Sequence, residues 1–273
     1  MAQRVRPHLG TLVAIEAAAS TEARALAAIE AAFAAIERVA GLLHPKTGSD
    51  SRALRAAPIG AGVRLDPWSY EVLSACRELH AASGGVFDPC LKDRPGRMGE
   101  IDLGVAGRAM KCADVALDLG GIAKGFAVDR AVAALREHGC SSGLVNAGGD
   151  VRVFGPAPWQ ILLRSASGAG YRLELEDSAV AVSEPKSARS PPEHIGYYIG
   201  TTGEPVAGRW VAVAAPSATL ADGLSKCAML CAPELLEPML ARYGARAIVG
   251  EDGSSRAPRV AEKNRGPEGP RWS

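Results

Sequence analysis

The sequence lacks a large net charge, a long apolar run and a paired-cysteine motif. Lysine and arginine number 31 against 30 acidic residues, so electrostatics give no reason to expect nucleic acid or an anionic membrane as a partner. Charges interrupt the apolar stretches well short of the roughly 20 residues that a membrane helix needs. The N-terminal MAQRVRPHLGTLVAIE contains neither an apolar signal-peptide core nor a small-residue cleavage site. We therefore expect a cytoplasmic protein.

The cysteines do not form a recognisable metal or disulfide pattern. There are six, at Cys76, Cys90, Cys112, Cys140, Cys227 and Cys231, without any CxxC pair. The last two lie four residues apart on an expected helix, but zinc would need two more ligands and the five histidines form no matching cluster. We expect free, mostly buried thiols.

The first half of the chain reads as helices with one strand. Residues 5–16 have the pattern of a strand, and residues 21–43 that of an amphipathic helix after a Ser20–Thr21 cap. Residues 45–51 are a polar segment, expected to be a loop. Asp66–Pro67 is typical of a helix start, and the helix should extend to about Ala82. Residues 92–111 show no clear period, and residues 117–139 predict a strand, a glycine turn and a helix.

The second half is rich in short β-type runs. GLVNAGGDVRVFG, WQILLR, YRLELE, AVAVS and WVAVAAP are separated by turn residues, and helices are expected at 219–231 and 233–243 before a strand at 247–250. Helices flanking a β-rich middle without regular βαβ alternation favour an α+β fold. We expect one domain over residues 1–250, and a disordered tail over residues 251–273 because that segment is polar and rich in proline and glycine.

The segment LDLGGIAKGFAVDR, Leu117 to Arg130, is the most informative one. An apolar strand leads through Gly120–Gly121 into a helix, and such a turn exposes backbone amides that a phosphate can approach. Lys124 adds a positive charge in the first turn. The segment matches neither GxGxxG nor GxxxxGK[ST], and strand–turn–helix connections are also common as plain structure.

Three other segments carry polar residues in turns or on a helix. SGGVFDP (residues 83–89) and LVNAGGDVRVFG (residues 144–155) are each compatible with an ordinary turn or hairpin. In APSATLADGLSKCAML (residues 215–230), Ser217 and Thr219 are helix-cap candidates. Asp222 and Lys226 stand i,i+4 on one helix face, where an intrahelical ion pair is the simplest interpretation.

In this order, RPHLGTLV and these four segments resemble the signature of the FAD:protein FMN transferase (ApbE-type) family, over about residues 6 to 250. The resemblance implies a single α+β unit of two joined lobes, with mixed or antiparallel sheets, flanking helices and FAD in a cleft between the lobes. It implies transfer of FMN from FAD onto a threonine hydroxyl of a target flavoprotein, with release of AMP. It also implies Mg²⁺ beside the pyrophosphate, held by a backbone carbonyl after the glycine turn and by an aspartate and a threonine on a later helix.

Carried onto this sequence, the resemblance assigns the metal-binding carbonyl to Ala123 and the metal-binding, catalytic carboxylate to Asp222. The residues that would line the flavin nucleotide are Leu9, Phe87, Asp88, Gly120, Gly121, Lys124, Phe126 and Tyr197. Asp129 would either orient neighbouring loops or be a solvated helix carboxylate.

Three positions depart from the family pattern. Lys226 stands where the metal-binding threonine is expected, and lysine has no acceptor with which to bind Mg²⁺. GYYIGTTGEP (residues 196–205) replaces an HIIDP-type strand, and only an insertion would make His194 equivalent to its histidine. SRALRA (residues 51–56) replaces an SRLN-type segment. These departures leave two main interpretations: a transferase with altered metal use, or a homologue that binds a flavin nucleotide without transferring it. An unrelated enzyme on the same fold is a third.

Overall fold

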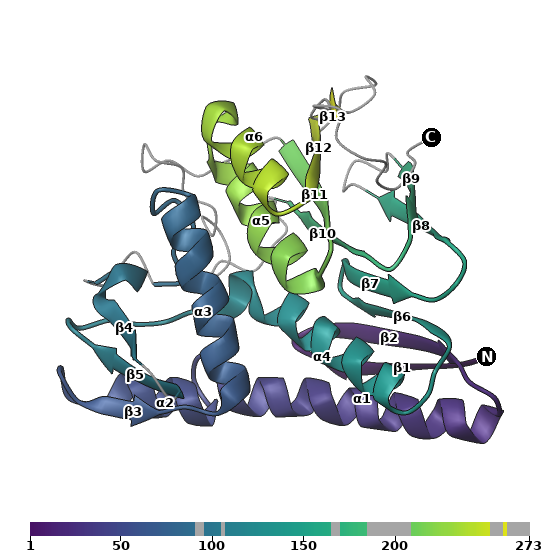
Figure 1. Cartoon of the computed structure of the whole chain (residues 1–273), viewed down its shortest axis with the longest axis horizontal. Coiled ribbons are helices and arrows are strands. Elements are labelled where there is room, and N and C mark those ends of the chain that lie inside the picture. The colour runs from purple at the N-terminus through teal and green to yellow at the C-terminus, as the bar shows by residue number, and fades with distance from the viewer. Residues whose placement is uncertain (91–95, 105–106, 165–169, 185–208, 252–258, 261–273) are drawn as a thin grey trace.

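The computed structural model of the chain describes residues 1–90, 96–104, 107–164, 170–184, 209–251 and 259–260. Within these residues the largest element is an eight-stranded sheet whose neighbouring strands all run antiparallel (Figure 1). Its strands, in spatial order, are β1 (Ala2–His8), β2 (Thr11–Ala18), β6 (Ser142–Ala147), β7 (Asp150–Phe154), β10 (Ala179–Ser183), β11 (Arg209–Ala215), β12 (Arg246–Glu251) and β13 (Arg259–Val260).

Two smaller sheets and six α-helices make up the rest of the regular structure in the described ranges. The small sheets are β3 (Gly62–Arg64), β5 (Arg108–Lys111) and β4 (Ile101–Gly104), and the hairpin of β8 (Trp159–Arg164) and β9 (Gly170–Leu175). The helices are α1 (Glu22–Leu43), α2 (Ser49–Ala56), α3 (Pro67–Ala82), α4 (Ala123–Glu137), α5 (Ala218–Leu230) and α6 (Pro233–Arg242). The predicted α+β class is confirmed. Among the described residues, the helices are all too short or too polar to cross a bilayer.

The main hydrophobic core lies between the large sheet and helices α1, α4 and α5. Val13 and Ile15 of β2 are fully buried, as is Ile29 of α1. A second, smaller core lies on the other face of the sheet, where the β8–β9 hairpin packs against β7, β10 and β11. Helix α1 extends along one side of the molecule from β1 and β2 to α2 and α3 (Figure 1). It therefore connects the large sheet to the part of the molecule that contains the three-stranded sheet.

The two long N-terminal helices start where their capping residues predict. The Thr21 side chain accepts a hydrogen bond from the N–H of Arg24 at 3.2 Å at the start of α1. At the start of α3, Asp66 accepts one from the N–H of Trp68 at 2.9 Å, and Pro67 is the first helical residue. These bonds satisfy N–H groups that have no partner inside the helix. The predicted helices at 21–43 and 67–82 are confirmed.

The predicted strand at residues 5–16 is wrong, because the segment is a hairpin. Leu9 and Gly10 have φ values of 53° and 71° and form a two-residue turn between β1 and β2. Consecutive positive φ angles are typical of tight hairpin turns, but a leucine at the first position gives no sequence signal for one.

Three shorter segments also differ from expectation. The segment expected to be a polar loop at 45–51 ends inside α2, a helix with one buried residue, Leu54, and therefore little apolar periodicity. Residues 92–111, without a clear period, include β4 and β5, which are four residues long. Leu117 forms only an isolated bridge with Cys90 instead of a strand.

The cysteines and the chain end can be compared with expectation only in part. All six cysteines are free, and only Cys112 is exposed, so the expectation of free and mostly buried thiols is confirmed. Near the C-terminus β13 pairs with β12. Residues 252–258 and 261–273 lie outside the described ranges, so the disordered tail stays a prediction.

Replacing Gly125 with alanine should destabilise the fold. A Cβ atom at Gly125 would lie 2.1 Å from the carbonyl oxygen of Ala218 and 2.7 Å from the Cβ of Asp222, where α4 crosses α5. Forcing the helices apart should lower the free energy of unfolding by about 1–3 kcal/mol or more, measured by urea denaturation. Gly41, an exposed glycine of α1 with no atom within 4 Å of a new Cβ, is the matched control. Gly41→Ala should stabilise by up to about 1 kcal/mol, and a similar response of both variants would contradict the crossing.

Candidate functional site

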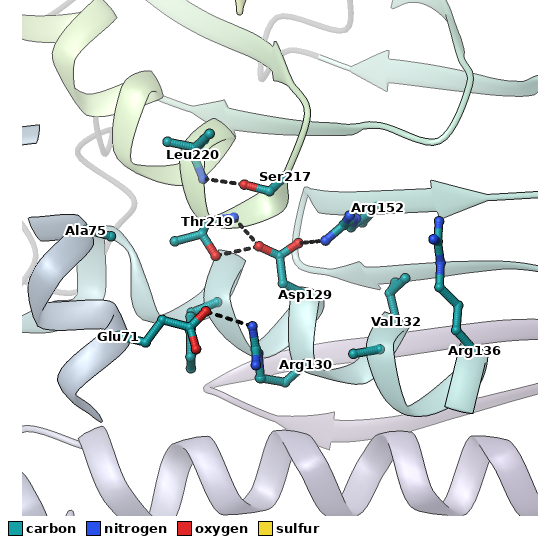
Figure 2. A pocket seen from close by; sticks show the side chains of 12 residues that line it. Glu71, Ala75, Asp129, Arg130, Val132, Arg136, Arg152, Ser217, Thr219 and Leu220 are labelled. Carbon is teal, nitrogen blue, oxygen red and sulfur yellow. Dashed lines mark hydrogen bonds and ion pairs between the residues drawn. The ribbon is translucent and has the colours of Figure 1, made fainter. Parts of the chain in front are cut away.

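The N-terminus of α5 is held by a buried carboxylate of α4. Asp129 accepts a hydrogen bond from the backbone N–H group of Ala218 at 2.9 Å. It also accepts hydrogen bonds from the backbone N–H group of Thr219 at 2.9 Å and from the Thr219 hydroxyl (Figure 2). Its side chain is 7% exposed and forms an ion pair with Arg152 at 2.5 Å. A carboxylate at this position satisfies the free N–H groups and interacts favourably with the helix dipole. Asp129 therefore orients a neighbouring segment, and the alternative of a solvated carboxylate is wrong.

Further along α5 lies the predicted ion pair of Asp222 and Lys226. The Lys226 ammonium donates a hydrogen bond to Oδ1 of Asp222, and the N–H of Gly125 donates to Oδ2 at 3.0 Å. Asp222 is completely buried and Lys226 nearly so. Burial by itself raises the pKa of Asp222, but the ammonium groups of Lys226 and Lys124 outweigh it and hold the pKa below its ordinary value. The i,i+4 pair is confirmed, with an ionised carboxylate.

A second buried carboxylate belongs to the same group of charges. Asp150, the first residue of β7, is 1% exposed; its Oδ2 accepts a hydrogen bond from Lys124, and its Oδ1 has no hydrogen-bond partner. Burial, which has the largest effect, and the negative charge of Asp222 raise the pKa of Asp150 to about 6. Lys124 and Lys226 act in the opposite direction and lower this pKa. We refer to Lys124, Asp150, Asp222 and Lys226 as the charge cluster.

The glycine turn before α4 lies against the charge cluster. A Cβ atom on Gly121 would be 3.7 and 3.8 Å from Cγ and Cε of Lys226, and 3.9 Å from Cε2 of Phe87. The N–H of Gly120 donates to Oδ1 of Asp118 at 2.9 Å, which shapes the turn. Three segments that are distant in sequence therefore meet here: the SGGVFDP loop, the glycine turn and α5.

Backbone contacts join the SGGVFDP loop to the glycine turn. The N–H of Asp118 donates to the carbonyl oxygen of Pro89 at 2.7 Å, next to the bridge between Cys90 and Leu117. Asp88 stabilises the loop from within, since its Oδ1 accepts a hydrogen bond from the N–H of Cys90 at 2.9 Å. The loop is therefore fixed relative to the start of α4.

The other oxygen of Asp88 lies near a histidine and an arginine. Oδ2 has no hydrogen-bond partner and lies 3.6 Å from Nδ1 of His80 and 3.9 Å from Nε of Arg97. His80 Nδ1 also lies 2.9 Å from the carbonyl oxygen of Phe87. The Asp88 side chain is only 6% exposed, so its carboxylate fixes the loop that carries Phe87.

Two serines connect the charge cluster to β10. The hydroxyl of Ser225 donates to the carbonyl oxygen of Asp222 at 2.7 Å and lies 2.7 Å from the Ser183 hydroxyl and 3.3 Å from Nζ of Lys226. All of these side chains are buried. The Lys226 ammonium therefore has oxygen atoms of both Asp222 and Ser225 within hydrogen-bond distance.

The remaining predicted site residues lie in different places. Leu9, half-buried in the β1–β2 turn, is near the β6–β7 turn, because the side chain of Thr11 fills the space beside Gly148. Phe126 is 1% exposed and its ring meets the edge of Trp68, at 6.5 Å between centroids. Residues two apart on a helix do not face each other, so Phe126 does not point the way Lys124 does. Tyr197 and His194 lie outside the described residues.

Asp150, Ser183 and Ser225 were not among the predicted site residues. The GGD sequence at residues 148–150 was interpreted as a hairpin, which is correct, but the pattern does not show that its aspartate is buried beside Lys124. The serines meet only because β10 packs against α5. The aspartate after the glycine pair was visible in the sequence, but nothing in the sequence indicates its burial.

With this geometry described, the chain can be compared with known proteins. Residues 97–249, more than half of the chain, match the family model described as "ApbE family". The chain belongs to the ApbE family. A protein of Rhodobacter capsulatus named "FAD:protein FMN transferase" is 29% identical over 186 residues, which are 57% of this chain and 36% of that protein. The match thus spans about a third of the curated relative's length.

Solved structures of the ApbE family share the fold. The apo form of the flavinyl transferase ApbE of Pseudomonas stutzeri aligns with a TM-score of 0.77 at 22% identity, covering 95% of this chain and 94% of that one. The ApbE protein of Thermotoga maritima aligns with a TM-score of 0.79 at 23% identity, covering 96% and 97%. The similarity extends over nearly the whole chain and establishes the architecture.

The described residues of this ApbE-family chain do not fit a Mg²⁺ ion. Mg²⁺ requires several oxygen ligands, whereas both oxygens of Asp222 already accept hydrogen bonds, from Lys226 and from Gly125. Within the described ranges, no three His, Cys, Asp or Glu side chains are grouped so that they could hold a metal. An ammonium group instead occupies the place next to the carboxylate.

A cavity of about 450 Å³ lies on another face of α4 (Figure 2). It is lined by parts of α3, α4 and α5, including Phe126 of α4, but by no residue of the charge cluster. Its three guanidinium groups form ion pairs: Arg130 with Glu71 at 2.8 Å, Arg152 with Asp129, and Arg136 with Asp177. The cavity therefore borders the capping network of α5 and is separate from the charge cluster.

Removing the Lys226 ammonium should destabilise the protein through Asp222. Lys226→Met leaves a buried carboxylate without its main partner, which should cost about 3–5 kcal/mol at neutral pH, measured by urea denaturation. Asp222→Asn in the Lys226→Met background should recover much of this loss, because the buried charge is gone. Glu30→Gln, at the exposed Arg6–Glu30 pair, is the control and should have little effect. Equal losses in the single and double variants would contradict the coupling.

The same pair predicts a pH dependence with a definite sign. The folded-state pKa of Asp222 lies below its ordinary value, so the pair contributes stability above the unfolded-state pKa of about 4 and loses it as the pH falls through the lower folded-state pKa. The Lys226→Met variant should lack this acid-sensitive contribution.

Proposed function

We propose that this chain binds FAD with its pyrophosphate over the Gly120–Gly121 turn and transfers FMN to a threonine hydroxyl of a protein acceptor, releasing AMP. Family membership and the name of the Rhodobacter capsulatus relative support this activity. The geometry that supports the site is the convergence of Gly121, Phe87 and Lys226 beside a second lysine, Lys124. A glycine turn at a helix N-terminus, flanked by ammonium groups, suits a diphosphate.

The observation on which the proposal depends most is the contact between Lys226 and Asp222. Asp222 holds the ammonium group of Lys226 in place through this hydrogen bond. Gly121, which has no side chain, leaves space beside the aliphatic part of the Lys226 side chain. Asp222 therefore acts as a positioning residue, and Lys226 is the group that would meet a phosphate oxygen. A lysine contacts phosphate as a point charge and needs no metal for this.

The reaction would exchange one phosphorus–oxygen bond for another. The hydroxyl oxygen of the acceptor threonine bonds to the phosphorus of the FMN half, and the bond from that phosphorus to the bridging oxygen breaks. AMP leaves with the bridging oxygen, and the hydroxyl proton passes to solvent. Lys226 and Lys124 would stabilise the negative charge that develops on the leaving phosphate.

The same ion pair also favours a second candidate function, binding of FAD without transfer. One ammonium group carries a single charge and does not organise several oxygens at once, as a divalent cation does. Incubation of the purified protein with FAD and an acceptor protein, with and without Mg²⁺, separates the two functions. AMP and a fluorescent, flavin-labelled acceptor are expected for the transferase, and bound but uncleaved FAD for the second function.

Replacing Gly121 with valine should weaken FAD binding. The first side-chain carbon would make only ordinary contacts, at 3.7–3.9 Å, so the fold should tolerate it, but the two methyl groups would occupy space needed by the phosphate. We expect at least a tenfold loss of affinity, about 1.4 kcal/mol, in a calorimetric titration with FAD. Gly41→Ala serves as the control. Unchanged FAD affinity in a folded Gly121→Val protein would show that the pyrophosphate does not bind at this turn.

Replacing Lys226 with threonine should make the site respond to Mg²⁺. The hydroxyl supplies an oxygen ligand next to the Asp222 carboxylate, which loses its ammonium partner. We expect FAD binding by the wild type to depend little on Mg²⁺ and transfer to be slow, whereas both should increase with Mg²⁺ in Lys226→Thr. Asp222→Ala should abolish the response of that variant. Fast Mg²⁺-dependent transfer by the wild type that survives Asp222→Ala would refute this assignment.

A further inference from the structure

Asp150 is the least satisfied charged group of the charge cluster. Its side chain is only 1% exposed. Its Oδ2 accepts a hydrogen bond from Lys124, but its Oδ1 has no hydrogen-bond partner. A buried carboxylate oxygen without a donor is costly, and a proton on that carboxylate removes most of the cost. The backbone at this point leaves little freedom, since Asp150 directly follows the Gly148–Gly149 turn and begins β7.

The ionisable groups around Asp150 come from every element packed at this point. Helix α4 contributes Lys124, and α5 contributes Asp222 and Lys226. Strand β10 ends at Ser183, and Glu184 follows it. The SGGVFDP loop, whose Phe87 lies near Gly121, carries Asp88 beside His80 of α3. Burial and Asp222 raise the pKa of Asp150 to about 6, so small changes in charge nearby alter its protonation near neutral pH.

We propose that Asp150 takes up a proton from solvent when the diphosphate of FAD binds beside Lys124, and that it thereby sets the charge available for that ligand. This inference rests on the proposed FAD site. An incoming diphosphate adds negative charge next to the carboxylate, which favours its protonated form. Each proton on Asp150 raises the charge of the cluster by one, and it weakens the hold of Asp150 on the Lys124 ammonium, which can then turn to a phosphate oxygen.

Asp150 acts in this scheme as a positioning residue. It contacts Lys124 and not the reacting atoms, and its protonation removes the carboxylate charge that faces this lysine. When the nucleotide product leaves, the diphosphate charge is gone and the proton returns to solvent. The cycle therefore involves binding and release of one proton and no covalent change at Asp150.

The test is a calorimetric titration of the full chain with FAD in two buffers that differ in ionisation enthalpy. FAD itself has no group that ionises between about pH 5.5 and 7.5, so any proton uptake belongs to the protein. We expect close to one proton per FAD bound near pH 7.5, and an affinity that falls about 25-fold from pH 5.5 to 7.5, as the protonated fraction of a group with a pKa near 6 does.

Asp150→Asn keeps the shape of the side chain and removes its ionisation. This variant should bind FAD without pH dependence, and at pH 7.5 at least as tightly as the wild type. His80→Gln, which removes the imidazole beside Asp88, should keep the wild-type pH dependence. If Asp150→Asn does not fold, a wild-type protein that takes up no proton still overturns the inference, and proton uptake that persists in His80→Gln supports it.

The outcomes separate this inference from the proposed function. FAD binding that is independent of pH and without proton uptake overturns the role of Asp150 and leaves the FAD site intact. A pH dependence that persists in folded Asp150→Asn but disappears in His80→Gln assigns the proton to His80 and overturns it as well. No binding of FAD at any pH overturns the proposed function, and the inference with it.

Discussion

Helices α4 and α5 cross at Gly125, and the close contact there positions the charged groups of the candidate site. Because Gly125 has no side chain, its N–H reaches the carboxylate of Asp222 directly. One turn along α4, Asp129 holds the first residues of α5. Hydrogen bonds at two levels therefore fix the rotation and the height of α5. This rotation is what places Lys226 against Gly121 and not on another face.

The charge cluster achieves internally part of what a bound cation achieves elsewhere. Each buried carboxylate of the cluster accepts a hydrogen bond from one lysine, Asp222 from Lys226 and Asp150 from Lys124. Buried ion pairs gain little net stability, because desolvation offsets most of the attraction. Their position at a glycine turn agrees with the proposed anionic ligand. The pairs keep two ammonium groups in the site when no ligand is bound, at the expense of some stability.

Much of the fold follows from local signals, but the site depends on long-range packing. The helices at 22–43 and 67–82 begin at capping residues and show regular apolar periodicity, so the sequence predicts them well. The β1–β2 hairpin does not follow, because Leu9 adopts a positive φ that the sequence does not signal. For the site, the i,i+4 spacing predicts the Asp222–Lys226 pair. The contact of Asp150 with Lys124 arises from how the sheet packs on α4, and no local pattern indicates it.

The central hydrogen bond of the site joins residues 97 positions apart in the chain, Gly125 and Asp222. Contacts of such long sequence separation require the closure of large loops and form slowly compared with local ones. During synthesis, α4 is therefore made well before α5. The small-residue face of α4, with Gly125, stays exposed until the last quarter of the chain has been made. Assembly of the site is a late event in folding, and the chain is most exposed to misfolding and to chaperone binding in that interval.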